Sequence, residues 1–238
     1  MSGAPLKAAV VGHPIGHSQS PTIHGHWLET TGIAGTYEAM DLHPDSFEAD
    51  IRKLVDQGFQ GVNATVPHKE VALAIADEVD DTARRIGASN TLVFRDGRIH
   101  AKNTDAFGFW QNLVPQLHGQ VPQRAVVLGA GGAARAVLVA LQDAGVGHVI
   151  LANRTHGRAT ALAEELADTA TIETLTWDDA EALLDQEAVD LIVNTSSRGM
   201  KGEHPITCAL AAQTPETVVN DIVYSPLQTA LLETAAAR

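Results

Sequence analysis

Cysteine, long apolar runs and positive charge are all scarce in this sequence, and each scarcity excludes a class of protein. The single cysteine, Cys208, excludes a disulfide within the chain and is typical of a reducing compartment, so we expect a cytoplasmic protein. No apolar run approaches the roughly 18 to 20 residues that cross a bilayer, so we expect no membrane partner. The stretch from Met1 to Lys7 is too short and polar for a secretory signal.

Acidic side chains outnumber basic ones by 29 to 16, which gives a net charge of −13. This charge argues against a nucleic-acid partner, because such a partner requires a basic face. It also means that local groups must bind any anionic ligand, since the field of the whole molecule repels it. With 238 residues, of which 45% are hydrophobic and 19% charged, the chain has the composition of a globular protein with one or two cores.

Short apolar runs alternate with helix-length segments along most of the chain, an order that favours βαβ units and a mostly parallel sheet. Strands are predicted at 6–11, 36–40, 61–66, 124–128, 148–152, 189–194 and 217–222. Helices are predicted at 21–30 and 45–57, from about 132 and 156, and in the Ala-rich pieces 159–170 and 230–237. Segment 91–100 differs, because Asp96-Gly97 between two apolar runs predicts a hairpin.

The sharpest motif follows the predicted strand at 124–128 and opens the next helix. It reads Gly129-Ala130-Gly131-Gly132-Ala133-Ala134, the G-x-G-x-x-A pattern of dinucleotide sites. In this pattern the first glycine permits a tight turn, the second lets the backbone approach the pyrophosphate, and the alanine lets the helix pack on the sheet. The helix N-terminus attracts the phosphates. A glycine-rich turn without a ligand is the alternative, which the flanking strand and helix make less favourable.

The residues after the next strand bear on the choice between NAD and NADP. An NAD site usually carries Asp or Glu about 20 residues after the glycines, to bind the ribose hydroxyls. No carboxylate follows the strand at 148–152, whereas Arg154 and Arg158, four residues apart, can share one face and pair with a 2′-phosphate. Two solvated arginines are the alternative, but the helix dipole disfavours cations at a helix start unless an anion is near. We therefore predict NADP.

A polar stretch from Asn103 to Asp105 separates the two alternating regions. We therefore predict an α/β protein with two domains. Residues 1–104 form an N-terminal substrate-binding catalytic domain with a mostly parallel sheet, and residues 105–238 form a C-terminal Rossmann domain that binds NADP. The helix after the boundary is expected to connect the domains, and the last helix, near 226–238, to pack back toward the first domain.

Polar residues gather beside predicted strand ends and helix starts in the first domain. Ser18 and Ser20 flank a helix start at Pro21, so one can cap the helix while the other donates to a carboxylate. Lys69 follows a strand end, where ligands of open α/β sheets bind, and begins a helix whose dipole favours loss of its proton. Many such lysines are merely exposed. Asp105 could cap the next helix or bind the Lys69 ammonium, which leaves the lysine pKa open.

Together these motifs resemble the shikimate dehydrogenase family, which includes the quinate/shikimate dehydrogenases. Eight strings match in the family's order and spacing over nearly the whole chain: His17-Ser18-Gln19-Ser20-Pro21, Asn63-Ala64-Thr65-Val66-Pro67-His68-Lys69, Ala88-Ser89-Asn90-Thr91, Asn103-Thr104-Asp105, Gly129-Ala130-Gly131-Gly132-Ala133, Asn153-Arg154-Thr155, Asn194-Thr195-Ser196-Ser197-Arg198-Gly199-Met200 and Asp221-Ile222-Val223-Tyr224-Ser225-Pro226. The resemblance implies reversible, NADP-dependent reduction of 3-dehydroshikimate to shikimate in aromatic amino-acid biosynthesis, the chorismate pathway.

The resemblance also implies a role for each matching residue. The substrate carboxylate would contact Ser18, Ser20 and Tyr224, and the ring hydroxyls and carbonyl would contact Thr65, Lys69, Asn90 and Asp105. Lys69 and Asp105 would be the catalytic pair for proton transfer. NADP would contact Gly129, Ala130, Gly131, Gly132, Ala133, Asn153, Arg154, Thr155 and Arg158, with Ile222 near the nicotinamide and Asp81 at a further cofactor position. The arginine pair argues against the NAD-using quinate relatives, which tend to have an acid there.

The sequence departs from the family at its C-terminal end. Members usually continue past the Tyr224 region with a glycine-containing segment and a long helix whose glutamine touches substrate, whereas this sequence stops at Arg238. We therefore expect lower turnover than that of a full-length member, and a bare apolar patch on the first domain.

Other interpretations stay open. A non-catalytic, regulatory NADP-binding protein on the same scaffold would suit the short end but would not explain Lys69 and Asp105. A folate-linked NADP dehydrogenase suits the paired serines less well, because they fit a small carboxylic acid. We expect a small-molecule substrate and a monomer or homodimer.

A metal site is the remaining alternative, suggested by the histidines His13, His17, His24 and His26. No Asp, Glu or Cys joins them at ligand spacing, so we predict no metal. Cys208 has no base or basic residue at motif distance, and we interpret it as an ordinary side chain.

Overall fold

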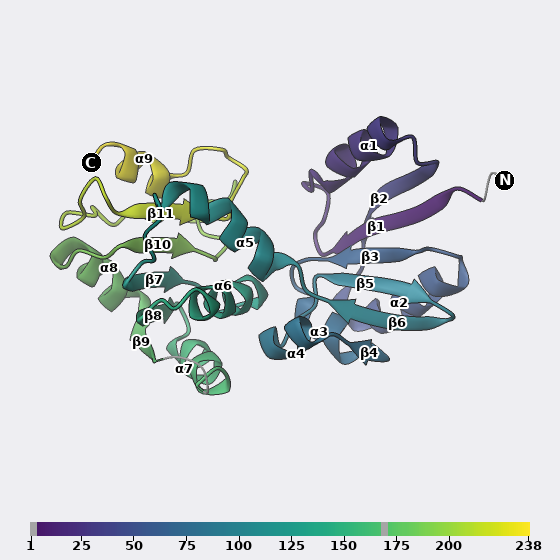
Figure 1. Cartoon of the computed structure of the whole chain (residues 1–238), viewed down its shortest axis with the longest axis horizontal. Coiled ribbons are helices and arrows are strands. Elements are labelled where there is room, and N and C mark those ends of the chain that lie inside the picture. Colours follow the sequence, from purple (N-terminus) through teal and green to yellow (C-terminus); the bar gives the residue numbers. More distant parts are fainter. Residues whose placement is uncertain (1–3, 168–170) are drawn as a thin grey trace. The chain divides into compact units, whose positions relative to one another are not determined.

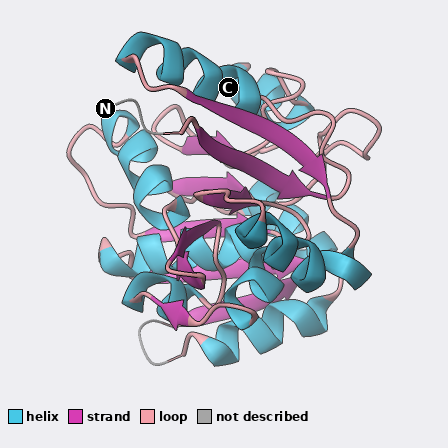
Figure 2. Cartoon of the chain, turned by 90° about the vertical axis from the view of Figure 1, so that its right-hand side faces the viewer, coloured by secondary structure: helices cyan, strands magenta, loops and turns pink. Residues whose placement is uncertain are grey.

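The computed structural model describes residues 4–167 and 171–238, which divide into two units, Met1–Thr104 and Asp105–Arg238 (Figure 1). Within those residues, every helix is too short or too polar to cross a bilayer. Each unit is built on one sheet with helices beside it, so the predicted α/β class is confirmed. Helices in cyan flank the strands in magenta in Figure 2.

The first unit contains a six-stranded sheet in the order β2-β1-β3-β5-β6-β4. Its elements, in chain order, are β1 (Leu6–Gly12), α1 (Ser20–Thr31), β2 (Gly35–Asp41), the 3-10 turn η1 (Pro44–Ser46), α2 (Phe47–Asp56), β3 (Gly61–Ala64), α3 (Lys69–Ala74), β4 (Glu78–Val79), α4 (Asp81–Ile86), β5 (Thr91–Arg95) and β6 (Arg98–Lys102). β1 runs parallel to β2 and β3, and β4 runs parallel to β6, whereas β5 is antiparallel to β3 and β6.

The antiparallel strand results from the predicted hairpin, which is confirmed. Asp96 and Gly97 have φ angles of 53° and 71°, the left-handed pair that a tight two-residue turn requires. β3 ends at Ala64, two residues before the predicted strand end, because the chain turns there and His68 N donates to Thr65 O. The helical region predicted at 45–57 divides into η1 and α2. β4 and α4 were not predicted.

One face of the first sheet contains most of the core. Phe47, Ile51 and Leu54 recur along α2 at the spacing of one helix face and are buried against β1, β3 and β5. α1 contributes no buried residue, and its Trp27 is 54% exposed. The core that supports the polar loops of this unit therefore lies mainly between α2 and the sheet.

The second unit contains a five-stranded, all-parallel sheet in the order β11-β10-β7-β8-β9. Its elements are α5 (Asp105–Leu113), η2 (Val114–Gln116), β7 (Arg124–Leu128), α6 (Gly132–Asp143), β8 (His148–Asn153), α7 (His156–Glu165), β9 (Ile172–Thr176), α8 (Trp177–Gln186), β10 (Leu191–Asn194), β11 (Val218–Asp221) and α9 (Ala230–Ala236). The central strands β7, β8 and β10 are buried on both faces, as parallel strands between two helical layers are. β9 and α8 were not predicted.

Two predicted helices are corrected by the structure. The last helix was predicted near 226–238 but begins at Ala230, because the Thr229 side chain caps it by accepting from Leu232 N. It lies along β11, and Leu231 is buried in the core of the second unit. The helix predicted at 159–170 ends at Glu165, and residues 168–170 lie outside the described residues. The helix expected to connect the domains, α5, packs on α6.

Candidate functional site

In the first unit, the loops after β1 and β3 lie against each other at the carboxyl ends of two parallel strands. His13 N donates to Val66 O at 3.1 Å, and Thr65 N donates to Val11 O at 2.9 Å. Gly12 makes this approach possible, because a Cβ there would lie only 2.7 Å from Thr65 Cγ2. The contact brings the loop of Ser18 beside the loop of Thr65, as ligand sites of open α/β sheets require.

The two predicted substrate serines have different local roles. α1 begins at Ser20, and Ser20 N donates to Ser18 Oγ at 3.3 Å, so Ser18 satisfies a backbone donor at the helix start. Pro21 is the second helical residue. The Ser20 hydroxyl makes no hydrogen bond within the described part of the chain. The expected division, with one serine serving the helix and the other facing a ligand, is compatible with this geometry.

Asn90 belongs to a chain of side-chain hydrogen bonds within the first unit. Tyr37 donates to Asn63 Oδ1 at 2.6 Å, and Asn63 donates to Thr91 Oγ1 at 3.1 Å. Thr91 Oγ1 and Thr104 N both donate to Asn90 Oδ1, at 2.9 and 3.0 Å. Asn90 Nδ2 donates to Thr104 Oγ1 at 2.9 Å. These bonds fix which way the Asn90 amide points.

Sequence reasoning assigned no role to Tyr37 or to Asn63, although Asn63 stands in one of the matching strings. Asn63 is a polar residue between the buried Val62 and Ala64, so it faces the other side of β3 from the core. Burial raises the pKa of Tyr37 to about 12, and the His24 ring stacks on it at 3.9 Å. Tyr37 is therefore a neutral hydrogen-bond donor at physiological pH.

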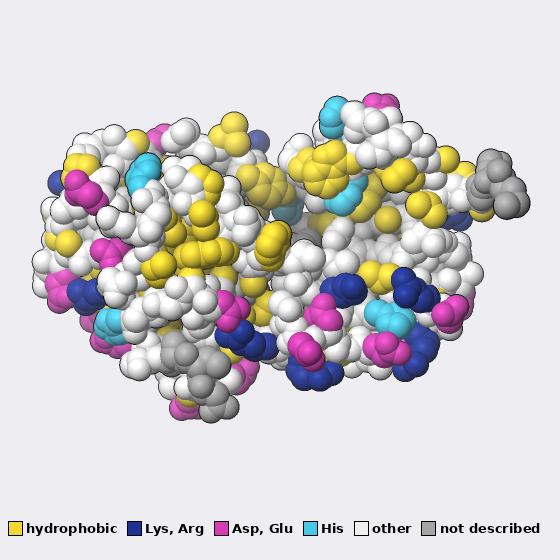
Figure 3. All heavy atoms as spheres, in the orientation of Figure 1, with side chains coloured by type: hydrophobic (Ala, Val, Ile, Leu, Met, Phe, Trp, Pro, Cys, Tyr) yellow, Lys and Arg dark blue, Asp and Glu magenta, His cyan; other side chains and the backbone are white. Residues whose placement is uncertain are grey.

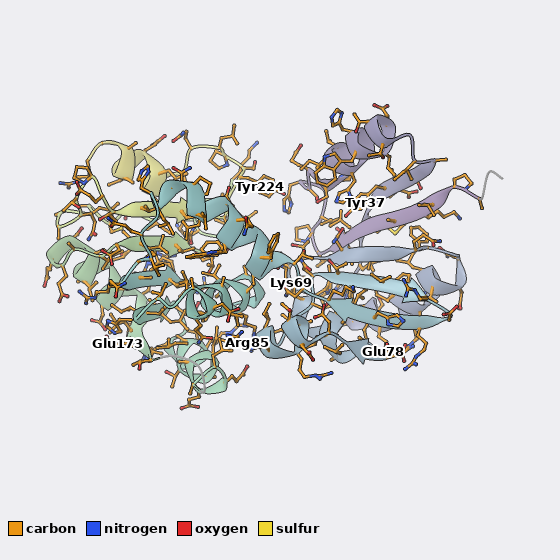
Figure 4. The ribbon with its side chains drawn as sticks, viewed as in Figure 1. Tyr37, Lys69, Glu78, Arg85, Glu173 and Tyr224 are labelled. Carbon is orange, nitrogen blue, oxygen red and sulfur yellow. The ribbon has the colours of Figure 1, made fainter. Side chains whose placement is uncertain are left out.

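Lys69 begins α3, as predicted (Figure 4). Its carbonyl accepts from Ser89 N at 2.8 Å, which ties the helix start to the residue before Asn90. His68 next to it is 1% exposed, bonds Leu42 O through Nε2 at 2.8 Å and stacks on Phe47. Burial lowers the pKa of His68, so it is neutral and anchors the lysine's backbone.

Asp105, the other half of the predicted catalytic pair, is the first residue of α5 and the first of the second unit. It directly follows Thr104, which bonds Asn90. Because Lys69 belongs to the first unit, the pairing of the two side chains stays a prediction. Asp81, a predicted cofactor residue, begins α4 and is fully exposed, with Arg84 Nη1 at 3.9 Å. Its cofactor contact also stays a prediction.

Two of the four histidines weighed as metal ligands have other side-chain partners in the first unit. His13 bonds the Asp41 carboxylate, and this hydrogen bond lowers the pKa of Asp41. His24 stacks on Tyr37. Across residues 4–167 and 171–238, no group of three or more His, Cys, Asp or Glu side chains could bind a metal ion. In the second unit, Cys208 is buried, which raises its pKa to about 11 and makes it a poor nucleophile.

In the second unit, the glycine motif forms the turn between β7 and α6. Gly129 has a φ of 113°, and a Cβ there would lie 2.7 Å from Thr195 Oγ1, so only glycine fits beside the loop after β10. Gly131 is the N-cap of α6 without a side-chain cap, and a Cβ there would point into open space. The free N-terminus of α6 and the room above Gly131 fit a dinucleotide pyrophosphate.

Arg154 and Arg158 follow β8, next to β7 in the sheet. Both are exposed, and neither makes an ion pair with any described carboxylate. Arg154 lies before α7, so the two arginines do not share one helix face as predicted. Asn153 Nδ2 donates to Thr155 O at 2.9 Å and shapes the loop between them. Within the described part of the chain, the loop after β8 therefore still offers a 2′-phosphate two cations that are not paired with a carboxylate.

Ile222 and Tyr224 follow β11 at the same carboxyl edge of the sheet. Tyr224 is labelled in Figure 4. They are 39% and 50% exposed, whereas Val223 between them is 7% exposed. Ile222 and Tyr224, both predicted to contact ligands, are therefore exposed on either side of the buried Val223, which anchors the segment.

Several charged side chains elsewhere form pairs that are exposed to solvent. Glu78 on β4 contacts Arg98 at 2.8 Å and His100 at 3.0 Å. Figure 3 shows acidic and basic side chains intermixed on the surface of the first unit. Such exposed pairs contribute little to stability, and we assign them no functional role.

Two family models match the chain. The shikimate dehydrogenase substrate-binding domain matches residues 10–92, and the shikimate/quinate 5-dehydrogenase model matches residues 112–222. A curated relative from Methylobacterium radiotolerans, shikimate dehydrogenase (NADP(+)), is 50% identical over 243 aligned residues, covering 100% of this chain and 85% of the relative.

Two solved structures are similar over both units. Shikimate 5-dehydrogenase from Thermus thermophilus, in complex with NADP(H) and shikimate, is 39% identical with a TM-score of 0.81, covering 98% of this chain and 84% of that one. Shikimate dehydrogenase from Aquifex aeolicus is 34% identical with a TM-score of 0.87, covering 100% and 85%. The chain therefore belongs to the shikimate dehydrogenase family.

Proposed function

We propose that this protein is an NADP-dependent shikimate dehydrogenase, which reversibly reduces 3-dehydroshikimate to shikimate in aromatic amino-acid biosynthesis. The observation that carries the proposal is the arrangement of residues at the carboxyl edge of the second sheet. There the Gly129 turn leaves the start of α6 open, and Arg154 and Arg158 follow β8 without an ion pair to any described carboxylate. The relatives named above as NADP-dependent or NADP-bound shikimate dehydrogenases support the substrate.

Each substrate group has a candidate partner among the polar residues. Ser20 and Tyr224 carry hydroxyls that can donate to a carboxylate, and Ser18 supports the start of the helix that carries Ser20. Asn90, with its amide oriented by two donors to Oδ1, can bind a ring hydroxyl, and Thr65 lies at the end of β3 for the same purpose. The set suits a small acid with several hydroxyls.

Bound NADPH supplies the hydride that converts the ketone to an alcohol. The Lys69 ammonium donates a proton to the carbonyl oxygen as the carbon–oxygen double bond becomes a single bond, and it regains a proton from solvent. In this proposal Asp105 would orient the ammonium, which is the role that the family resemblance implies for it. In the reverse direction neutral Lys69 accepts the hydroxyl proton.

We also propose that the enzyme is cytoplasmic, because a chain with a single cysteine is typical of a reducing compartment. It is further proposed to act on a small molecule as a monomer or homodimer. The regulatory, non-catalytic alternative gains no support from the comparisons, since the relatives cited are named as dehydrogenases.

The proposal is tested by following NADPH absorbance as 3-dehydroshikimate is added. Consumption of NADPH that depends on 3-dehydroshikimate and runs backward with shikimate and NADP is the expected result. A protein that binds NADP tightly and shows no turnover in either direction would instead support the alternative, a regulatory NADP-binding protein.

A further inference from the structure

We propose that Asp221 is a positioning residue, whose carboxylate directs the side chains of Ile222 and Tyr224 outward at the carboxyl edge of the second sheet. The inference rests on the proposed function, which assigns Ile222 to the nicotinamide and Tyr224 to the substrate. Asp221 is the last residue of β11. The chain that follows β11 leads to α9 (Figure 1).

The Asp221 carboxylate accepts three hydrogen bonds from three separate segments. Asn194 Nδ2 at the end of β10 donates to Oδ1 at 2.9 Å, and Val223 N donates to the same oxygen at 3.0 Å. Thr229 Oγ1 at the start of α9 donates to Oδ2 at 2.7 Å. Asn194 and Thr229 are 0% and 2% exposed, so two of the donors are withdrawn from water. The carboxylate therefore ties β10, β11 and α9 together.

The bond to Val223 N sets the direction of its neighbours. A carboxylate that accepts from the backbone two residues later fixes a local turn. Val223 is buried at 7% exposure, so its side chain and its amide are both anchored. Ile222 and Tyr224 on either side are then left exposed, where a ligand at the sheet edge can reach them.

Through Asn194 the same network reaches the glycine turn. Asn194 Oδ1 accepts from Ser196 N at 3.0 Å and from Ser196 Oγ at 2.7 Å, which shapes the loop after β10. The neighbouring Thr195 donates to Leu128 O at 2.9 Å, beside Gly129. Hydrogen bonds within the second unit thus connect the segment 221–224, which is assigned to the nicotinamide, with the Gly129 turn, which is assigned to the cofactor phosphates.

The donors to Asp221 are all neutral, and no ion pair to this carboxylate occurs in the described residues. The positioning role of Asp221 therefore depends on where its oxygen atoms accept hydrogen bonds and not on its negative charge. In an Asp221→Asn variant the amide oxygen can keep the bonds to Asn194 and Val223, while the amide nitrogen donates to the Thr229 hydroxyl. An Asp221→Ala variant has no acceptor for any of the three donors.

Asp190 offers a matched control at the opposite edge of the sheet. It precedes β10, and its Oδ2 accepts from Gln123 N at 2.7 Å and from Arg124 N at 2.9 Å. Asp190→Ala therefore removes a carboxylate that binds backbone donors in the same unit, at the other end of the strands from the carboxyl edge. It should preserve turnover.

The first experiment compares steady-state kinetics and cofactor-fragment binding in the folded full chain. Asp221→Ala is expected to lower kcat by about tenfold or more and to raise KM for shikimate, because the reacting groups lose their alignment. Affinity for 2′,5′-ADP, the adenosine half of the cofactor, should change by less than about twofold, since the arginine loop is untouched and the bond from Thr195 to Leu128 O beside the glycine turn does not involve Asp221. Asp221→Asn should restore most of the loss.

The second readout is hydrogen exchange of the backbone amides at 222–225 in the ligand-free protein. Exchange should be faster in Asp221→Ala than in the wild type or Asp190→Ala. Thr229→Val, which removes one donor, should give the same pattern with a smaller change if Asp221→Ala does not fold. Equal kinetic losses in Asp221→Ala and Asp190→Ala, or unchanged exchange at 222–225, would overturn the inference. A wild type without turnover would refute the proposed function, while exchange would still test the positioning.

Discussion

Replacing Arg154 and Arg158 by serine should change the choice of cofactor more than the ability to bind one. Both side chains are exposed and make no ion pair with a described carboxylate, so their removal leaves no acid unpaired in the described residues. The principal loss is then the contact with the 2′-phosphate of NADP, a group that NAD lacks. NAD binding through the Gly129 turn should be nearly unchanged.

The expected size of the effect follows from the exposure of the two guanidinium groups. A hydrogen bond to a charged group contributes about 1.5–3 kcal/mol, and solvent screening favours the lower end here. Since about 1.4 kcal/mol corresponds to a factor of ten, each single variant should lose about tenfold in NADP affinity, and the Arg154→Ser/Arg158→Ser double variant about 100-fold.

The assay is kcat/KM with NADPH and with NADH for the wild type, both single variants and the double variant. Arg52→Ser is the control, because Arg52 is an exposed guanidinium of the first unit, paired with Glu48. Added salt should narrow the gap between the wild type and the variants, since screening weakens exposed contacts. Equal losses with NADPH and NADH would refute the assignment of these arginines to the 2′-phosphate.

Three further outcomes are expected. Lys69→Met should lower kcat by about 10²–10⁴-fold while NADPH binding, followed by nucleotide fluorescence, is kept, and a parallel loss of binding would contradict its role in proton transfer. Burial raises the pKa of Tyr37 to about 12, so the tyrosinate absorbance of a Tyr224→Phe variant, in which Tyr37 is the only tyrosine, should develop near pH 12. Because this pKa lies above the unfolded value of 10.0, the stability supplied by neutral Tyr37 is present below pH 10 and lost as the pH rises toward 12, and a transition of the folded protein near pH 10 would argue against the burial. Gly12→Ala should lower the free energy of unfolding by about 1–3 kcal/mol, because its Cβ would lie 2.7 Å from Thr65 Cγ2, whereas Gly16→Ala in the same loop meets nothing within 4 Å and should be nearly neutral in denaturant titrations.

Much of the fold was predictable because its signals are local. Asp96-Gly97 marked the hairpin, since few residue pairs accept two left-handed φ angles in a row. The Gly129 motif and the start of α3 at Lys69 were likewise readable from residues close together in the chain. The strands missed in the prediction were the edge strands β4 and β9, whose partly exposed residues show weak apolar patterning.

The site was only partly predictable, for a related reason. The side chains assigned to ligands follow strand ends that can be read from the sequence, whereas the groups that orient them come from distant segments. Tyr37 reaches Asn63 across 26 positions, and Asn194 reaches Asp221 across 27. A hydrogen bond between residues far apart in the chain produces no recognisable pattern in the sequence around either residue.

By itself, then, the sequence determined the alternation of strands and helices, the glycine turn and the absence of an acid beside Arg154, because each depends on neighbouring residues. The tertiary structure alone decided that β5 enters the first sheet antiparallel to β3 and that Asp221 accepts hydrogen bonds from β10 and the start of α9. Sheet order and buried hydrogen bonds depend on which segments pack together, and packing minimises the free energy of the whole unit rather than of any one stretch.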